Sequence, residues 1–166
     1  MPSRSLRRLR GPAFVGGMAV AASIWAATLV AAPYAVTHEA PETAAFRAAS
    51  GVYVVGGVVC HQQAVRSFHL WDRQLPVCAR CAGLYAGAPG GLLLALLLLP
   101  TPGRRGRRFT PEELRALRRL LIAAAVPTAL TVAIEGPNAM RAVSAVPLGL
   151  AVAWIAARAA REVLDA

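Results

Sequence analysis

The sequence predicts an all-α protein, an integral membrane helical bundle of four transmembrane helices with a helix and loop on its outer face. The chain has 166 residues, of which 57% are hydrophobic and 16% charged, and its mean hydropathy is +0.51. Several apolar runs approach the roughly 20 residues that a helix needs to cross a bilayer. The basic residues gather at the ends of these runs, which is typical of membrane proteins.

All 18 basic residues are arginine, and the net charge is +10. Such a charge would also suit a protein that binds nucleic acid. The arginines instead flank the apolar runs, which indicates that they set the orientation of the chain in a membrane. We therefore expect the lipid bilayer, and no nucleic acid, as the partner.

The first apolar run covers about residues 12–36 and follows a basic segment that contains Arg4, Arg7, Arg8 and Arg10. A basic segment before an apolar run is also typical of a secretory signal peptide, and the small residues near position 31 would suit cleavage. The run is longer than the roughly 7–15 apolar residues of such a signal. We therefore expect a retained membrane anchor.

Three further spans are expected at about residues 83–99, 120–134 and 142–157. The last two runs are short for a complete crossing, and flanking apolar residues are expected to complete them. The second span carries Gly83, Gly87 and Gly91 on one face. A face without side chains favours close packing against another helix, with a homo-oligomer seam as the alternative.

The segment 44–60 is a fifth apolar candidate, although it contains Arg47 and Ser50. If only the four longer runs cross and the amino terminus is cytoplasmic, thirteen arginines face the cytoplasm and five face outside. A fifth crossing would place the arginine cluster at 104–108 outside, against the positive-inside rule. We therefore predict that 44–60 packs at the outer face of a multi-pass plasma-membrane protein with both termini cytoplasmic.

In this arrangement residues 1–166 form one membrane domain, with an outer loop at 37–82 and a basic cytoplasmic loop at 100–119. The cytoplasmic loop contains a signal for a helix start. Thr110 is expected as the N-cap, Pro111 as the first helical residue, and a glutamate of the Glu112-Glu113 pair as the capping-box partner. The helix is expected to continue into the third span.

The three cysteines are Cys60, Cys78 and Cys81, and the last two form a CxxC pair just before the second span. Exposed N–H groups and the helix dipole favour thiolate there, the form that binds metals and attacks disulfides. A tetrahedral zinc site needs a fourth ligand, which would be His61 or His69. Because His61 adjoins Cys60, it can share a metal with Cys60 only through an unusual backbone turn, whereas His69 has freer reach.

Three interpretations of the cysteines stay open. They bind a metal, with zinc as the first choice, or they form a thiol relay, or they form a disulfide that only pins the loop. We expect a structural zinc site in a non-enzymatic protein, with a membrane thiol- or metal-dependent oxidoreductase that uses the CxxC pair as the alternative. No residue is assigned a catalytic role.

Four short motifs together resemble the signature of a known family: Cys60-His61-Gln62, Arg66-Ser67-Phe68, Pro76-Val77-Cys78-Ala79-Arg80-Cys81 and Gly83-Leu84-Tyr85-x-Gly87. The family is DUF2085, small predicted integral membrane proteins of bacteria and archaea with no established function. Glu135-Gly136 and Asn138-x-x-Arg141 also resemble elements of the family near a later span. Because His61 is a signature position and His69 is not, the resemblance favours His61 as the fourth ligand.

Glu135, Asn138 and Arg141 lie between the third and fourth spans, on the same predicted outer face as the cysteines. An ionisable group at the edge of a membrane span is a candidate for function. Ordinary turn chemistry and an ion pair between Glu135 and Arg141 would also explain these residues. We expect that hydrogen bonds to the histidine or thiolates come from a surrounding set of polar residues, namely Gln62, Arg66, Arg80, Glu135, Asn138 and Arg141.

Overall fold

The computed structural model describes residues 10–98 and 109–164, most of which are helical. The long helices are α2 (Arg10–His38), α4 (Ala79–Leu98), α5 (Pro111–Ala133) and α6 (Asn138–Leu164), and α3 (Ala44–Val59) is shorter. Between α3 and α4 lie a short 3-10 helix, η1 (Ala64–Arg66), and an antiparallel hairpin of β1 (His69–Leu70) and β2 (Arg73–Gln74). The predicted all-α class is confirmed.

Four helices of the described chain, α2, α4, α5 and α6, are long and apolar enough to cross a membrane. The shortest of them, α4, has 20 residues, which at 1.5 Å per residue corresponds to roughly the 30 Å of a bilayer core. Helix α3 has only 16 residues. The predicted bundle of four spans is therefore confirmed. Each span begins earlier than its apolar run because polar residues belong to its first turn or, in α5, to its first two turns.

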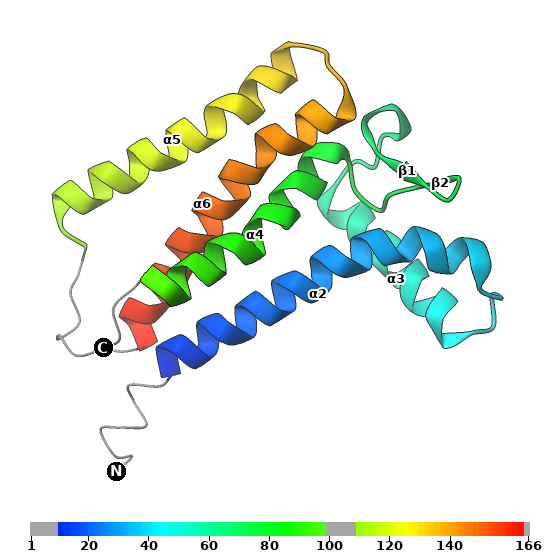
Figure 1. Cartoon of the computed structure of the whole chain (residues 1–166), viewed down its shortest axis with the longest axis horizontal. Coiled ribbons are helices and arrows are strands. Elements are labelled where there is room, and N and C mark those ends of the chain that lie inside the picture. The colour runs from blue at the N-terminus through cyan, green and yellow to red at the C-terminus, as the bar shows by residue number, and fades with distance from the viewer. Residues whose placement is uncertain (1–9, 99–108, 165–166) are drawn as a thin grey trace.

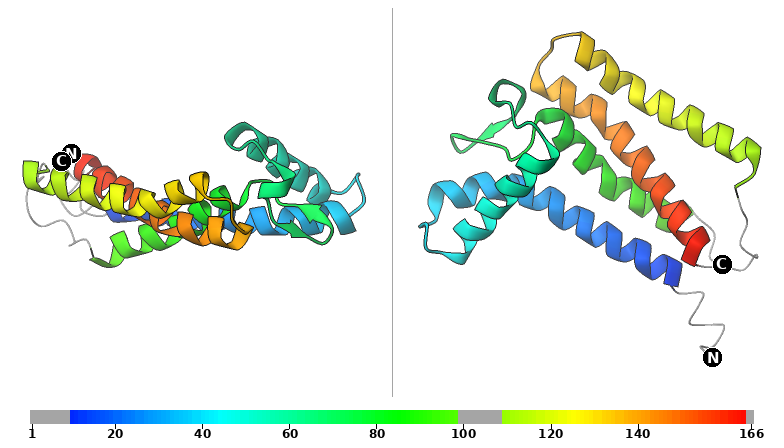
Figure 2. Two further views of the ribbon diagram at one scale, coloured as in Figure 1. Left: turned by 90° about the horizontal axis from the view of Figure 1, so that it is seen from above. Right: turned by 180° about the vertical axis from the view of Figure 1, so that it is seen from behind.

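The four long helices lie side by side in the order α2, α4, α6, α5, so that α4 and α6 form the middle of the bundle (Figure 1). The start of α2 and the end of α6 lie at one end of the bundle in both Figure 1 and the right panel of Figure 2. Helix α3 and the hairpin lie at the opposite end, beside the start of α4. The arginines at positions 4–8 and 104–108 lie outside the described residues, and the orientation in the membrane stays a prediction.

Close contact between α4 and α6 depends on glycines in both helices. A Cβ atom at Gly83, Gly87 or Gly91 would overlap a backbone carbonyl oxygen of α6, and one at Gly149 would overlap that of Leu84. The two helices run parallel, and only residues without side chains allow their backbones to come so close. The glycine face of α4 is thus covered by α6 of the same chain, as close helix packing predicts, and the alternative of a homo-oligomer seam has no free surface on this face.

Polar contacts join α5 to its neighbours at both ends. At its start, the predicted capping box is present: the Thr110 N–H donates to Glu113 Oε2 at 2.9 Å, and the Glu113 N–H donates to Thr110 Oγ1 at 3.2 Å. Glu113 Oε1 also accepts from Arg158 Nη2 of α6 at 3.0 Å. At the other end, Arg80 of α4 donates to the hydroxyl and the carbonyl oxygen of Thr131.

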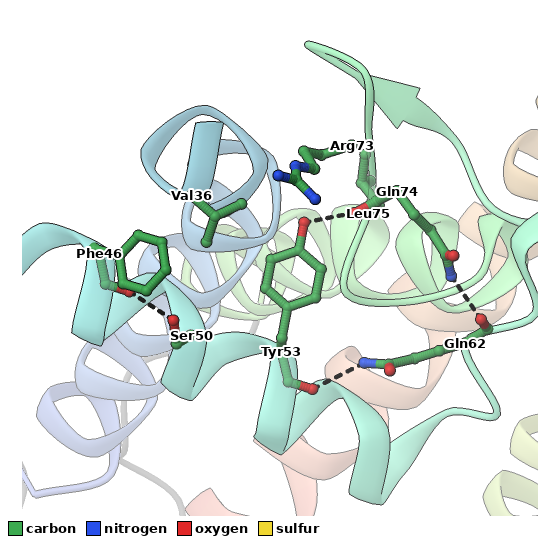
Figure 3. Close-up of a pocket in the computed structure, with 8 residues that line it drawn as sticks. All are labelled: Val36, Phe46, Ser50, Tyr53, Gln62, Arg73, Gln74 and Leu75. Carbon is green, nitrogen blue, oxygen red and sulfur yellow. Dashed lines mark hydrogen bonds between the residues drawn. The ribbon is translucent and has the colours of Figure 1, made fainter. Parts of the chain in front are cut away.

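Gln62 fastens the end of α3 to the hairpin. Its amide nitrogen donates to the carbonyl oxygens of Tyr53, at 2.8 Å, and Pro76, at 2.7 Å. In return, the Gln74 amide donates to the Gln62 carbonyl oxygen at 2.6 Å, and the Tyr53 hydroxyl donates to the Gln74 carbonyl oxygen at 2.6 Å (Figure 3). Gly56 is needed below this network, because a Cβ atom there would overlap the Pro76 carbonyl oxygen.

Replacing Gly87 with alanine is expected to destabilise the bundle, because the added methyl group would overlap the Val146 carbonyl oxygen. Overpacking of this kind costs about 1–3 kcal/mol. Gly90→Ala is the matched control, since its Cβ would lie 3.9 Å from Leu150 Cδ1, an ordinary contact. The melting temperature of each purified variant in detergent measures the loss of stability. Equal melting temperatures for the two variants would contradict the close α4–α6 contact.

Replacing Gln62 with glutamate is expected to loosen the segment between α3 and α4, because a carboxylate cannot donate to the Tyr53 and Pro76 carbonyl oxygens. The buried carbonyl of Pro76 would lose this donor, which costs about 1–3 kcal/mol. Gln63→Glu adds the same charge at the neighbouring exposed residue and serves as the control. The readout is the rate at which a maleimide labels buried Cys60, followed by peptide mass spectrometry. The labelling rate should rise only in Gln62→Glu, and an unchanged rate would refute this role of Gln62.

Candidate metal centre

The three cysteines converge from two segments of the chain. Cys60 is the C-terminal cap of α3, Cys78 directly precedes α4, and Cys81 lies in the first turn of α4. Their sulfur atoms all lie within 4.8 Å of one another, and none of the three forms a disulfide. The backbone N–H of Cys78 donates to Cys60 Sγ at 3.2 Å, which ties the two segments together. The fold thus assembles the cluster that the sequence indicated.

Cys78 has the character of a thiolate. A hydrogen bond from the Cys81 thiol lowers the pKa of Cys78 to about 5, against an ordinary value of 9.0, although burial acts in the opposite direction. Hydrogen bonds from the backbone N–H groups of Cys81 and Arg80, at the start of α4, also lower the pKa of Cys78. The backbone contribution agrees, for Cys78, with the expectation that N–H groups at a helix start favour the charged sulfur, but the largest contribution comes from the Cys81 thiol, which keeps its proton in order to donate it.

One side of the cysteine cluster is apolar. Cys60 is only 8% exposed and packs with Leu29 of α2 and with Val77. The ring of Trp25 meets that of Tyr85 edge to face, with 5.8 Å between the centroids, beside the same cluster. Such surroundings restrict water on this side of the sulfurs.

The other side of the cluster opens into a cavity of about 370 Å³. Besides the three cysteines, its walls include His61, Gln62, Arg66 and Arg80. His61 therefore shares a cavity with the thiols, whereas His69 is an exposed residue of β1 and does not line it. Among the described residues, the group of ligand atoms within 4.8 Å of one another consists of the three sulfurs and does not include a nitrogen of His61. Three thiols and an imidazole at one cavity are a donor set that suits zinc.

The turn between α5 and α6 lies against the loop that follows Cys60. The Asn138 side-chain amide donates to the carbonyl oxygen of Ser67 at 3.0 Å and to that of Val65 at 3.5 Å. The α5–α6 turn therefore packs beside the loop that follows Cys60, as we expected. These bonds reach backbone carbonyls, so direct hydrogen bonding from Glu135, Asn138 or Arg141 to the histidine or thiolates stays a prediction.

The ion pair considered between Glu135 and Arg141 is not among the ion pairs of the described residues. Arg141 instead points its Nη1 at Asn138 Oδ1, 3.4 Å away. Arg66 lines the cysteine cavity and also a second cavity that contains Glu135, Asn138 and Arg141. The two polar clusters thus adjoin each other through Arg66.

Two supporting residues escaped the sequence analysis. Ser67 is 1% exposed, donates to the Gln63 carbonyl oxygen at 2.9 Å and accepts from Gln74 Nε2 at 3.3 Å. Thr131 anchors Arg80 to the end of α5. A signal existed for each: Ser67 belongs to the Arg66-Ser67-Phe68 motif, and Thr131 is a polar residue inside an apolar span.

Comparison with known proteins agrees with the membrane fold and the motif. Residues 60–155, more than half of the chain, match a family described as predicted membrane protein (DUF2085). The chain is also 40% identical, over 43 residues, to the uncharacterized protein MJ1492 of Methanocaldococcus jannaschii. That alignment covers 26% of this chain and 28% of the relative, so the chain spans less than a third of the relative's length. No solved structure matches the chain. On the family match, the chain belongs to the DUF2085 family of predicted membrane proteins.

Proposed function

We propose that this membrane protein holds a zinc ion with Cys60, Cys78, Cys81 and His61, and that the ion stabilises the fold rather than catalysing a reaction. The observation that supports the proposal is the placement of the three sulfur atoms within 4.8 Å of one another, at the meeting point of α3 and α4. The arginine count, with thirteen of 18 on the opposite side, supports an extracytoplasmic location for this site.

The spacing of the sulfurs suits zinc. Thiolates lie about 2.3 Å from zinc, so two of them on a tetrahedral ion are roughly 3.8 Å apart. Small side-chain rotations would bring three sulfurs that are within 4.8 Å to this separation. The lowered pKa of Cys78 supports its role as one ligand, because a thiol must lose its proton to bind a metal, and the ion would displace the proton that Cys81 donates to Cys78.

A structural role follows from the number and position of the ligands. Four protein ligands fill a tetrahedral site and leave no open position for a substrate. Cys60 caps the end of α3, whereas Cys78 directly precedes α4 and Cys81 lies in its first turn. A shared ion would therefore link the helix at the outer face to a helix that spans the membrane, through a loop with little regular structure of its own.

The alternative is a thiol oxidoreductase, which the low pKa of Cys78 also favours. In that reaction the Cys78 thiolate attacks a substrate disulfide, and Cys81 then displaces the second substrate sulfur. The products are a Cys78–Cys81 disulfide and two substrate thiols, so the substrate gains the two electrons that the CxxC pair loses.

Zinc content separates the two functions. Protein purified in detergent without added chelator is expected to contain one zinc per chain, with cysteines that react with thiol reagents only after chelation. His61→Gln should lower zinc affinity by at least about tenfold, since even outer partners of a zinc ligand contribute that much. His69→Gln is the matched control, because His69 is exposed and lies outside the cavity. Metal-free protein with a reducible disulfide would support the oxidoreductase and end the zinc proposal.

A further inference from the structure

A second cavity of about 430 Å³ lies where the loop after Cys60 meets the turn between α5 and α6. Its polar walls are Arg66 from the loop and Glu135, Asn138 and Arg141 from the turn. The turn joins two helices that are long and apolar enough to cross a membrane, so we expect this cavity at the level where a bilayer presents its headgroups.

Arg141 is a buried charge that forms no ion pair among the residues that the structure describes. Its side chain is 8% exposed, and its Nε atom is buried with no hydrogen-bond partner. Its Nη1 atom is 3.4 Å from Asn138 Oδ1, near the limit of a hydrogen bond. A buried guanidinium normally has an anionic partner, because leaving it unpaired is strongly unfavourable.

The position of Arg141 in its helix adds to this cost. It lies in the first turn of α6, a helix of 27 residues, where the unpaired N–H groups and the helix dipole already carry positive charge. Arg66 places a second guanidinium on the same cavity, and neither arginine is in an ion pair of the described residues. The arrangement therefore attracts an anion.

We propose that this cavity binds a phosphate group, held by the guanidinium groups of Arg141 and Arg66, with Asn138 positioning Arg141. The planar fork of an arginine matches two phosphate oxygens at once. Two arginines and one glutamate leave a net charge of about +1 on the cavity when all are ionised. A singly charged phosphodiester fits this balance better than inorganic phosphate, so an anionic phospholipid headgroup is the preferred source.

Substitutions of the two arginines and of the glutamate of this cavity should change phosphate binding in opposite directions. Arg141→Gln and Arg66→Gln should each weaken phosphate binding by about tenfold, since each removes charged hydrogen bonds. Glu135→Gln should strengthen it, because it removes the one negative charge on the cavity wall. Arg47→Gln is the matched control: Arg47 is an exposed arginine of α3 that does not line this cavity.

The test uses purified full-length protein in a maltoside detergent and follows the melting temperature during three titrations. The probes are phosphatidylglycerol, diacylglycerol with the same acyl chains, and inorganic phosphate at matched ionic strength. We expect a saturable rise with phosphatidylglycerol and none with diacylglycerol. A rise with inorganic phosphate at similar concentration would identify soluble phosphate as the source and still support a phosphate site.

Three results would overturn the proposal: no rise with either phosphate probe, an equal rise with diacylglycerol, or a wild-type titration in Arg66→Gln or in folded Arg141→Gln. Because Arg66 and Glu135 are exposed, their variants remain informative even if Arg141→Gln fails to fold. Zinc content is measured in the same samples. Loss of phosphate binding with zinc retained would show that the two sites are separate.

Discussion

The close approach of the α4 and α6 backbones is the contact on which the positions of both polar sites depend. Gly83, Gly87 and Gly91 of α4 face carbonyl groups of α6 at distances that exclude any side chain. Because the two helices run parallel, their starts lie at the same end of the bundle (Figure 1). The start of α4 carries Cys78 and Cys81, and the start of α6 carries Asn138 and Arg141. Packing between two apolar helices thus brings the cysteine motif and the α5–α6 turn together.

Side-chain bonds to backbone groups then hold the irregular segments in place. Gln62 joins α3 to the chain before α4, Asn138 joins the α5–α6 turn to the loop at Ser67, and Arg80 joins α4 to the end of α5. A metal shared by Cys60, Cys78 and Cys81 would add a stronger connection between the same elements.

Local signals made much of this fold predictable. Apolar runs predicted the four spans, the Thr110–Glu113 pair predicted a capping box that forms, and the spacing of three cysteines indicated a cluster. Contacts between distant segments were not predictable, because they depend on which helices become neighbours. The bond between Arg80 and Thr131 is one example, and the glycine face covered by α6 is another. The ion pair with Glu135, considered as the alternative explanation for Arg141, is replaced by a contact with Asn138, and the arginine is buried.

Coordination of zinc by Cys60, Cys78, Cys81 and His61 can be tested with the X-ray absorption spectrum of the purified protein at the zinc edge. This spectrum reports the type, number and distance of the ligand atoms. We predict three sulfur ligands at about 2.3 Å and one nitrogen ligand at about 2.0 Å. A shell of nitrogen and oxygen atoms alone, or the absence of a zinc signal from protein prepared without chelator, would contradict it.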